Sequence, residues 1–308
     1  MLWIFLALLG AITNAAYFII VKKYISELDP KLLTGIGFTL GGCLLFFFSA
    51  LRGIPAVGPE FFTAVAITSV LNILGLSLIF KALSSSDLSL SVPMLSFTPA
   101  MLIGTSYVIL HEVPSLFGFA GICIIVSGSY VLNIAEEHEH YLDPIRAMMR
   151  NRGSWYMLIV AFLFAVSINF DKIALLNSDP FFGMALTVMT IGIVLLVMVA
   201  CSRYAGRTGA AVRVSGNREE PGLPAPALPA RQFFVLTLLI GACVAVEAAS
   251  VNVALTMQIV PYVIAIKRLS IIFMVLYGTV VFSEGDSKKR VMGATLMVAG
   301  AIIILLFA

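Results

Sequence analysis

The sequence predicts an all-α integral membrane protein with ten transmembrane helices, arranged as two inverted five-helix repeats. Of its 308 residues, 60% are hydrophobic and only 11% are charged, a balance that a soluble domain of this size does not carry. Ten apolar segments approach the ~20 residues that a helix needs to cross a bilayer. Similar residues recur in the same order in both halves, which predicts a duplicated unit. Because each unit has an odd number of helices, the second copy must be inverted.

The ten apolar segments are separated by polar connections. We expect helices at residues 2–21, 32–51, 61–80, 88–110, 116–134, 155–175, 181–201, 232–255, 261–282 and 291–307. The domains are then a first repeat over 1–134, a hydrophilic linker over 135–153 and a second repeat over 154–308. Arginines and four prolines gather at residues 202–231 of the second repeat, which predicts a disordered loop there.

Two sequence offsets relate the halves. An offset of 150 applies at the start of each repeat and an offset of 172 applies later, because the Arg/Pro-rich loop lengthens the second copy. The aligned pairs are Lys22 with Lys172, Asp29 with Asp179, Gly42 with Gly192, Glu112 with Glu284, Gly121 with Gly293 and Gly128 with Gly300.

The basic residues of the loops predict the orientation of the chain. Of the 19 Lys and Arg residues, fifteen lie in connections on one side, and only Arg52 and Lys172 lie on the other. The positive-inside rule assigns the basic side to the cytoplasm, so both termini are expected outside. We expect a multi-pass protein of a cell membrane, with the bacterial inner membrane as the first candidate.

Two adjacent cations interrupt the ninth apolar segment. Lys267 and Arg268 each cost about 3 kcal/mol at a helix centre, so residues of this kind usually mark a ligand or a pathway. Glu247 lies at similar depth in the preceding segment and is placed to pair with one of them; the alternative is that it only neutralises the pair. It is also the first candidate for a proton-binding residue. Two cations against one anion predict an anionic substrate group, a carboxylate or a phosphate.

Further polar residues and prolines in the apolar segments complete the candidate site. The candidate substrate-binding residues are Lys267, Arg268, Glu247, Ser250, Thr98, Asn72, Tyr17 and Asn14. The candidates for a gate or an ion pair are Asp171, Lys172, Pro93 and Pro99. Structural alternatives stay open: hydroxyls that pack between helices, charged side chains that reach the membrane interface, and prolines that make static kinks.

The sequence favours a secondary transporter of a small molecule. It contains no H-E-x-x-H, no G-x-S-x-G and no intramembrane cluster of metal ligands, so we expect no enzyme, no cofactor and no metal. The alternative is an exporter of small organic cations or amines, or a lipid-headgroup flippase, that uses Glu247. The expected partners are a small-molecule substrate and the lipid bilayer, without nucleic acid, in a monomer or a homodimer.

These features together resemble the drug/metabolite transporter superfamily in its EamA-like branch. The resemblance rests on the two five-helix repeats, on Glu112 and Glu284 at the ends of segments four and nine, and on the glycine pairs of segments five and ten. It covers nearly the whole chain. It implies an alternating-access carrier in which helices three, four, eight and nine line a central cavity. Many relatives are described with cytoplasmic termini, whereas loop charge predicts the opposite here.

A second resemblance is confined to the ninth segment. The run Lys267-Arg268-Leu269-Ser270 is similar to the Lys-Arg pair with which plastidic phosphate translocators of this superfamily hold the phosphate of their substrate. It implies that Lys267 and Arg268 contact an anionic group directly.

Overall fold

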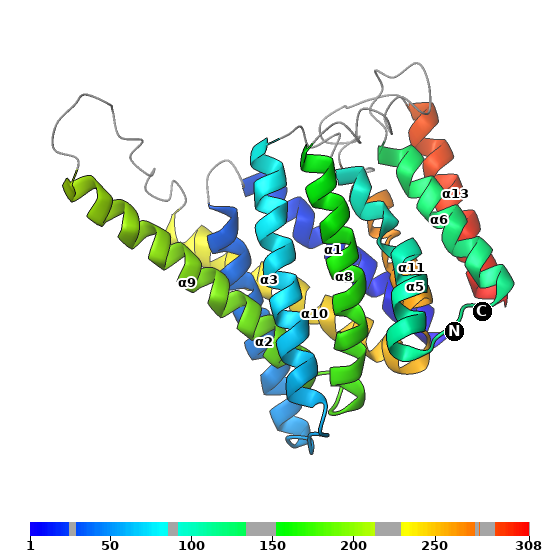
Figure 1. Cartoon of the computed structure of the whole chain (residues 1–308), viewed down its shortest axis with the longest axis horizontal. Coiled ribbons are helices and arrows are strands. Elements are labelled where there is room, and N and C mark those ends of the chain that lie inside the picture. Colours follow the sequence, from blue (N-terminus) through cyan, green and yellow to red (C-terminus); the bar gives the residue numbers. More distant parts are fainter. Residues whose placement is uncertain are drawn as a thin grey trace.

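The computed structural model describes residues 1–24, 29–85, 92–133, 152–212, 229–274, 277 and 287–307. Over these residues every regular element is a helix (Figure 1), as predicted. The elements are α1 (Leu2–Tyr24), α2 (Pro30–Arg52), α3 (Phe61–Ser85), the 3₁₀ helix η1 (Val92–Phe97), α5 (Thr98–Leu110), α6 (Leu116–Asn133), α8 (Arg152–Leu176), α9 (Phe182–Val212), α10 (Ala230–Met257), α11 (Val260–Lys267) and α13 (Ser287–Phe307).

Six of the described helices are long and apolar enough to cross a membrane. They contain the spans Leu2–Val21, Pro30–Arg52, Phe61–Ile79, Arg152–Leu176, Phe182–Ser202 and Arg231–Met257. Three shorter apolar helices, Met94–Leu110, Leu116–Leu132 and Val291–Phe307, accompany them. The chain is therefore a multi-pass membrane protein, in which helices satisfy the backbone hydrogen bonds that lipid cannot.

Local sequence signals explain where several helices begin and end. Asp29 caps α2 by accepting a hydrogen bond from the Lys31 amide at 2.9 Å, and the Asp179 carboxylate accepts the first two amides of the turn that opens α9 at 2.6 Å each. At the end of α2, Gly53 adopts φ of 96°, which favours glycine. At the end of α5, His111 is left-handed with φ of 57°.

The principal helix pairs join the first half of the chain to the second. α1 packs on α10, α2 on α9, α3 on α8 and α6 on α13, and Figure 1 shows the last pair side by side. Glycines bring α6 and α13 into backbone contact: a Cβ at Gly121 would lie 2.8 Å from the Gly300 carbonyl, and one at Gly128 would lie 2.7 Å from the Gly293 carbonyl. Substitution at these positions would push the two helices apart.

Two segments predicted as continuous helices, 88–110 and 261–282, are broken within their described parts. The first changes from 3₁₀ to α geometry between Phe97 and Thr98, because Pro99 has no amide hydrogen and favours the first turn of a new helix. The second ends as α11 at Lys267, turns at residues 268–269 and resumes at Ser270. Residues 88–91, 275–276 and 278–282 lie outside the described residues.

The predicted loop at 202–231 begins later than expected. α9 continues to Val212 and α10 begins at Ala230, so the start and the end of that stretch are helical. The arginines and alanines that follow Ser202 are good helix formers, and the prolines that oppose a helix begin only at Pro221. Residues 213–228 lie outside the described part, as do residues 134–151, which contain most of the predicted linker.

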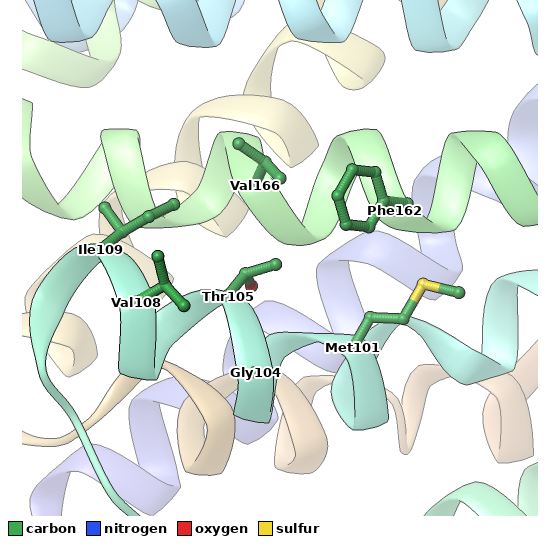
Figure 2. Close-up of a pocket in the computed structure, with 7 residues that line it drawn as sticks. All are labelled: Met101, Gly104, Thr105, Val108, Ile109, Phe162 and Val166. Carbon is green, nitrogen blue, oxygen red and sulfur yellow. The ribbon is translucent and has the colours of Figure 1, made fainter.

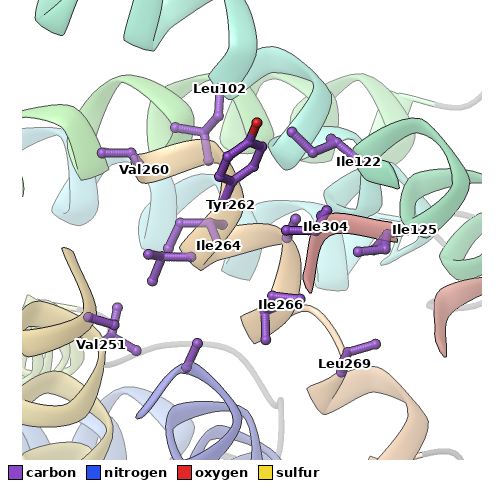
Figure 3. Packing of buried hydrophobic residues seen from close by; sticks show 14 of the residues in the cluster. Leu102, Ile122, Ile125, Val251, Val260, Tyr262, Ile264, Ile266, Leu269 and Ile304 are labelled. Carbon is purple, nitrogen blue, oxygen red and sulfur yellow. The ribbon is translucent and has the colours of Figure 1, made fainter. Parts of the chain in front are cut away.

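The largest hydrophobic cluster surrounds α11. Residues 260–266 are all buried, and Figure 3 shows several of them packed among side chains of α5, α6, α10 and α13. The labelled members of the cluster are Leu102, Ile122, Ile125, Val251, Val260, Tyr262, Ile264, Ile266, Leu269 and Ile304. This packing fixes α11, and therefore fixes the position of the two cations at its end.

Both termini lie at the same end of the bundle in Figure 1. The C-terminal end contacts the connection between α5 and α6, where the Ser115 hydroxyl donates to the Phe307 carbonyl at 3.1 Å. The Phe117 and Phe307 rings stack with centroids 4.8 Å apart. These contacts join the C-terminal end of α13 to the start of α6.

Candidate functional site

The two interior cations lie at a break in the helix that follows α10. Lys267 is the last residue of α11, where the negative end of the helix dipole stabilises a cation. After it the backbone tightens: the Leu269 amide donates to the Ile266 carbonyl at 3.0 Å, and the Ile271 amide donates to the Arg268 carbonyl at 3.1 Å. These three-residue hydrogen bonds leave the regular α-helical pattern and form a tight turn directly after Lys267.

Lys267 forms an ion pair with Glu247 of α10. The Lys267 Nζ lies 2.6 Å from the Glu247 Oε1, and the Asn14 Nδ2 of α1 donates to the same oxygen at 2.9 Å. The Lys267 side chain is 27% exposed and that of Glu247 is 15% exposed. The pair therefore connects α1, α10 and α11 and still has open space beside the lysine.

Arg268 forms no such ion pair with any described residue. Its Nε is buried, and it has no hydrogen-bond partner within the described residues. Glu247 acts on it electrostatically but already holds Lys267 at ion-pair distance. A buried guanidinium nitrogen without an acceptor is costly, so an anionic group at this position would satisfy it.

A second interior carboxylate, Asp171 of α8, ends a chain of hydrogen bonds. The Asn72 Nδ2 of α3 donates to the Ser167 Oγ at 2.6 Å, the Ser167 and Thr68 hydroxyls lie 2.6 Å apart, and the Thr68 Oγ1 donates to the Asp171 Oδ1 at 2.5 Å. Lys267 acts electrostatically on Asp171. Asp171 therefore belongs to the same charged region instead of reaching the membrane interface.

Lys172, the next residue, takes part in a separate contact. Its Nζ lies 2.5 Å from the Glu112 Oε1 and donates to the Gln258 carbonyl at 2.9 Å. The Glu112 Oε2 accepts the Val260 amide at the first turn of α11, at 2.7 Å. We name these residues, Glu112, Lys172, Gln258 and Val260, the end latch, because they join α8, the end of α5 and the α10–α11 junction.

Two of the candidate hydroxyl residues make contacts between helices or along one helix. The Tyr17 hydroxyl lies 3.2 Å from the Thr34 Oγ1 of α2 in a buried contact. The Ser250 Oγ donates to the Glu247 carbonyl of its own helix at 3.1 Å, and it is buried. Tyr17 also experiences the Glu247 charge, so it lies near the charged region, whereas Ser250 supports the backbone behind it.

The remaining candidates lie at the break between η1 and α5. The Thr98 Oγ1 is fully buried and donates to the Leu95 carbonyl at 2.7 Å. Pro99 is buried in the first turn of α5, and Pro93 lies within η1, although its side chain is outside the described part. These residues shape the backbone break, and within the described part of the chain Thr98 and Pro99 form no hydrogen bond with Lys267, Arg268, Glu247 or Asp171.

The sequence did not identify Thr68 and Ser167 as residues of the site, and it did not identify Glu112 as the partner of Lys172. Thr68 and Ser167 carry no signal, because hydroxyls on membrane helices usually serve packing. Glu112 carries one, since it recurs as Glu284 in the second half. The charged region also includes α1 and α8, beyond the four helices that the resemblance implies.

A cavity of about 500 Å³ lies between α5 and α8 but does not belong to the charged region. Its lining is Met101, Gly104, Thr105, Val108, Ile109, Phe162 and Val166, drawn in Figure 2. Thr105 is the one residue among these with a polar side chain, and its hydroxyl donates to the Ala165 carbonyl at 3.1 Å. Within the described residues, no group of three or more His, Cys, Asp and Glu is placed to hold a metal ion.

Comparisons with known proteins agree with this architecture. The model of the EamA-like transporter family matches residues 1–134, and no curated protein matches the chain. A crystal structure of a protein that is 16% identical aligns with a TM-score of 0.70, over 98% of this chain and 99% of that one. At this identity the likeness shows the fold alone.

Proposed function

We infer the function from one finding: the model of the EamA-like transporter family matches residues 1–134, which supports a membrane transporter of small substrates. We propose that it is a secondary transporter that moves a small anionic metabolite by alternating access. Among the residues of the site, Arg268 gives the strongest support for an anionic substrate.

The observation that carries the anionic substrate is the buried Arg268 Nε without an acceptor. Lys267 is already paired with Glu247 at 2.6 Å, so Arg268 is the cation that a substrate oxygen would complete. A guanidinium presents parallel N–H groups that suit a carboxylate or a phosphate. Lys267, 27% exposed, supplies a second positive charge beside it.

The alternating-access part of the proposal rests on the two broken helices and the end latch. The breaks at Thr98 and Arg268 fall in segments four and nine, which the proposed repeat relates to each other. Each break follows a short helix with a proline at its second position. Discontinuous helices at the centre of a transporter permit one half to rock against the other. The end latch closes one end of the bundle, which by loop charge is the outer end, so its breakage would accompany opening to that side.

The inverted ten-helix repeat is also part of the proposal, and the helix contacts support it. If the halves are related by a two-fold axis, each contact must have a partner with the roles exchanged. The offset of 172 converts the contact of Gly121 with Gly300 into that of Gly293 with Gly128, and both pairs occur. Likewise, α1 packs on α10 as α8 packs on α3.

The test is binding and transport by purified protein. In thermal-shift measurements, inorganic phosphate or succinate should raise the melting temperature of the wild type and not that of Arg268→Ala, while choline and glucose should have no effect. Counterflow in proteoliposomes with a panel of carboxylates, phosphates, amines and neutral solutes should then give uptake of anions. If stabilisation is equal for cationic and neutral ligands and Arg268→Ala transports normally, the anion proposal is wrong.

The alternative, an exporter of organic cations or amines or a lipid-headgroup flippase, would need Glu247 as its site. One oxygen of Glu247 already accepts both Lys267 and Asn14, which counts against a free cation site there. Stabilisation by choline that is lost in Glu247→Gln would favour this alternative.

A further inference from the structure

The hydrogen-bond chain that ends at Asp171 has a direction. Each hydroxyl has one hydrogen, so Thr68, which donates to Asp171 at 2.5 Å, must accept from Ser167 at 2.6 Å. Ser167 in turn accepts from the Asn72 amide at 2.6 Å. Every donor of the chain therefore points toward the carboxylate, the arrangement that satisfies an ionised Asp171.

The same residues also satisfy a protonated Asp171. A protonated carboxyl would donate to the Thr68 hydroxyl, which would turn toward the Ser167 Oγ or its carbonyl, at 2.6 Å and 3.3 Å. Ser167 would turn to the Thr68 carbonyl at 3.5 Å, and Asn72 keeps its bond to that carbonyl at 2.9 Å. Reversal of two hydroxyls thus accommodates one proton without moving the helices, and it leaves no donor unpaired.

The charges around Asp171 explain what would drive that reversal. α8 packs against α3, α5, α9, η1, α10 and α11. Among the described side chains, the charged groups that these elements bring to this region are Glu247, Lys267 and the adjacent Arg268, with the Lys172–Glu112 pair at the latch. The latch pair is neutral in sum. Lys267 and Arg268 against Glu247 and Asp171 are also neutral in sum when all four are ionised.

An anion bound at Arg268 would break this balance by one negative charge. Like charges disfavour ionisation, and the carboxylates respond according to their partners. Glu247 forms an ion pair with Lys267 at 2.6 Å, whereas among the described residues Asp171 accepts a hydrogen bond only from the Thr68 hydroxyl. Asp171 is therefore the group whose protonation costs least.

We propose that Asp171 takes up one proton when the anion binds and releases it when the anion leaves, which makes this residue the proton-coupling site of the transporter. The proton comes from solvent and forms the O–H bond of the Asp171 carboxyl, and Thr68 and Ser167 reverse their hydroxyls to receive it. This inference rests on the proposed anionic substrate. It also moves the proton-binding role from Glu247, the candidate of the sequence, to Asp171.

Infrared difference spectroscopy on purified protein tests the proton directly, with succinate as the probe anion. Protein labelled with ¹³C-aspartate should show the carbonyl band of a protonated carboxyl that grows as the pH falls from about 9 to 5. The band should grow further when succinate is added at a pH at which succinate itself is fully ionised. It should be absent from Asp171→Asn and should persist in Asp179→Asn, the matched control, where asparagine still caps α9.

The affinity for succinate gives the second readout. Uptake of one proton per anion predicts that the affinity of the wild type falls by up to about tenfold for each unit rise in pH. In Asp171→Asn, which resembles the protonated carboxyl, the affinity should not depend on pH. Asn72→Leu interrupts the donor end of the chain and leaves the carboxylate, so it should shift the pH dependence without abolishing it.

The outcomes separate the two proposals. If succinate and phosphate fail to stabilise the protein at any pH, the anionic substrate is wrong, and the coupling inference falls with it. If succinate stabilises the protein through Arg268 while the labelled carboxyl band stays constant, the anion proposal stands and the coupling inference is wrong. It is equally wrong if a zwitterionic amino acid stabilises the protein where carboxylates fail and the band is unchanged, because Asp171 would then hold an ammonium group.

Discussion

At the scale of single residues, Arg268 and Lys267 differ in what surrounds them, and this difference predicts unequal effects of substitution. Arg268 has a buried nitrogen without a partner in the described chain, whereas Lys267 already has Glu247. Arg268→Lys removes the planar pair of donors and should lose about 2 kcal/mol of anion binding, roughly thirtyfold in affinity. Lys267→Arg keeps the charge beside Glu247 and should be milder. Succinate titrations of both variants check the order, and a larger loss in Lys267→Arg would contradict it.

The charged residues of the site were predictable from the sequence because burial of a charge is costly and therefore conspicuous. Lys267, Arg268 and Glu247 stand out in apolar segments for that reason, and the last of these pairs with the first. Thr68 and Ser167 were not predictable, since their roles depend on Asp171 lying opposite them. The role of such a hydroxyl can be assigned only when the residues of the neighbouring helix are known.

At the scale of elements, the crossing of α6 and α13 depends on glycine. A Cβ at Gly300 would lie 2.6 Å from the Gly121 carbonyl, and the backbone of a packed helix cannot yield easily. Gly300→Ala should destabilise the protein by about 1–3 kcal/mol. Gly104→Ala is the matched control, because a Cβ there meets nothing within 4 Å, and alanine favours a helix. Thermal unfolding in detergent measures both, and equal melting temperatures would refute the backbone contact.

The end latch predicts how the bundle opens. Glu112 serves Lys172 and the Val260 amide at once, so Glu112→Gln removes the ion pair and leaves the buried lysine charge unbalanced. The closed conformation should lose roughly 1–3 kcal/mol relative to the open one, about a 5- to 150-fold change in their ratio. A cysteine at Ile259, beside the latch, should then react faster with a membrane-impermeant maleimide. Lys172→Met added to Glu112→Gln should recover part of the loss, and an unchanged labelling rate in Glu112→Gln would show that the latch is static.

Hydropathy located the helices well but could not locate their breaks. The average over a window is the same for a continuous helix and for one interrupted at Arg268, so segment nine was predicted as unbroken. The break in segment four lies beside Pro99, whose effect on the backbone is local. The late end of α9, by contrast, follows from the helix-forming residues after Ser202, which the overall polarity of the loop concealed.

At the scale of the whole molecule, the proposed repeat keeps its fold and changes its chemistry. The offsets relate Asn14 to Phe164 and Glu247 to Gly75, and a Cβ at Gly75 would lie 2.6 Å from the Phe164 ring. The polar contact between α1 and α10 therefore corresponds to an apolar contact between α3 and α8. The internal similarity predicts an inverted repeat, which stays a prediction, and it does not predict the site, which lies where the halves differ.

Loop charge predicts the orientation of the entire chain, with both termini outside. On a background without the four native cysteines, Ala56→Cys should react with an impermeant maleimide added to intact cells. Ser215→Cys should react only after permeabilisation. Ala56 is exposed, whereas at Gly58, two residues later, a Cβ would lie 2.2 Å from the Asn177 amide oxygen. Labelling of Ser215→Cys alone would reverse the assignment.

The pairing of helices across the halves has a consequence for how the protein is made. The principal partners of α1, α2, α3 and α6 are α10, α9, α8 and α13, respectively. The first half is therefore synthesised before its partners, while the helix faces that carry the contact glycines are still uncovered. It must remain in the membrane without its partners until the second half is inserted, and a chaperone or simple proximity has to protect it meanwhile. Two separate polypeptides cut within residues 134–151 should therefore be degraded when expressed singly and should accumulate together when co-expressed. Such a protein assembles in the manner of a dimer whose subunits share one chain.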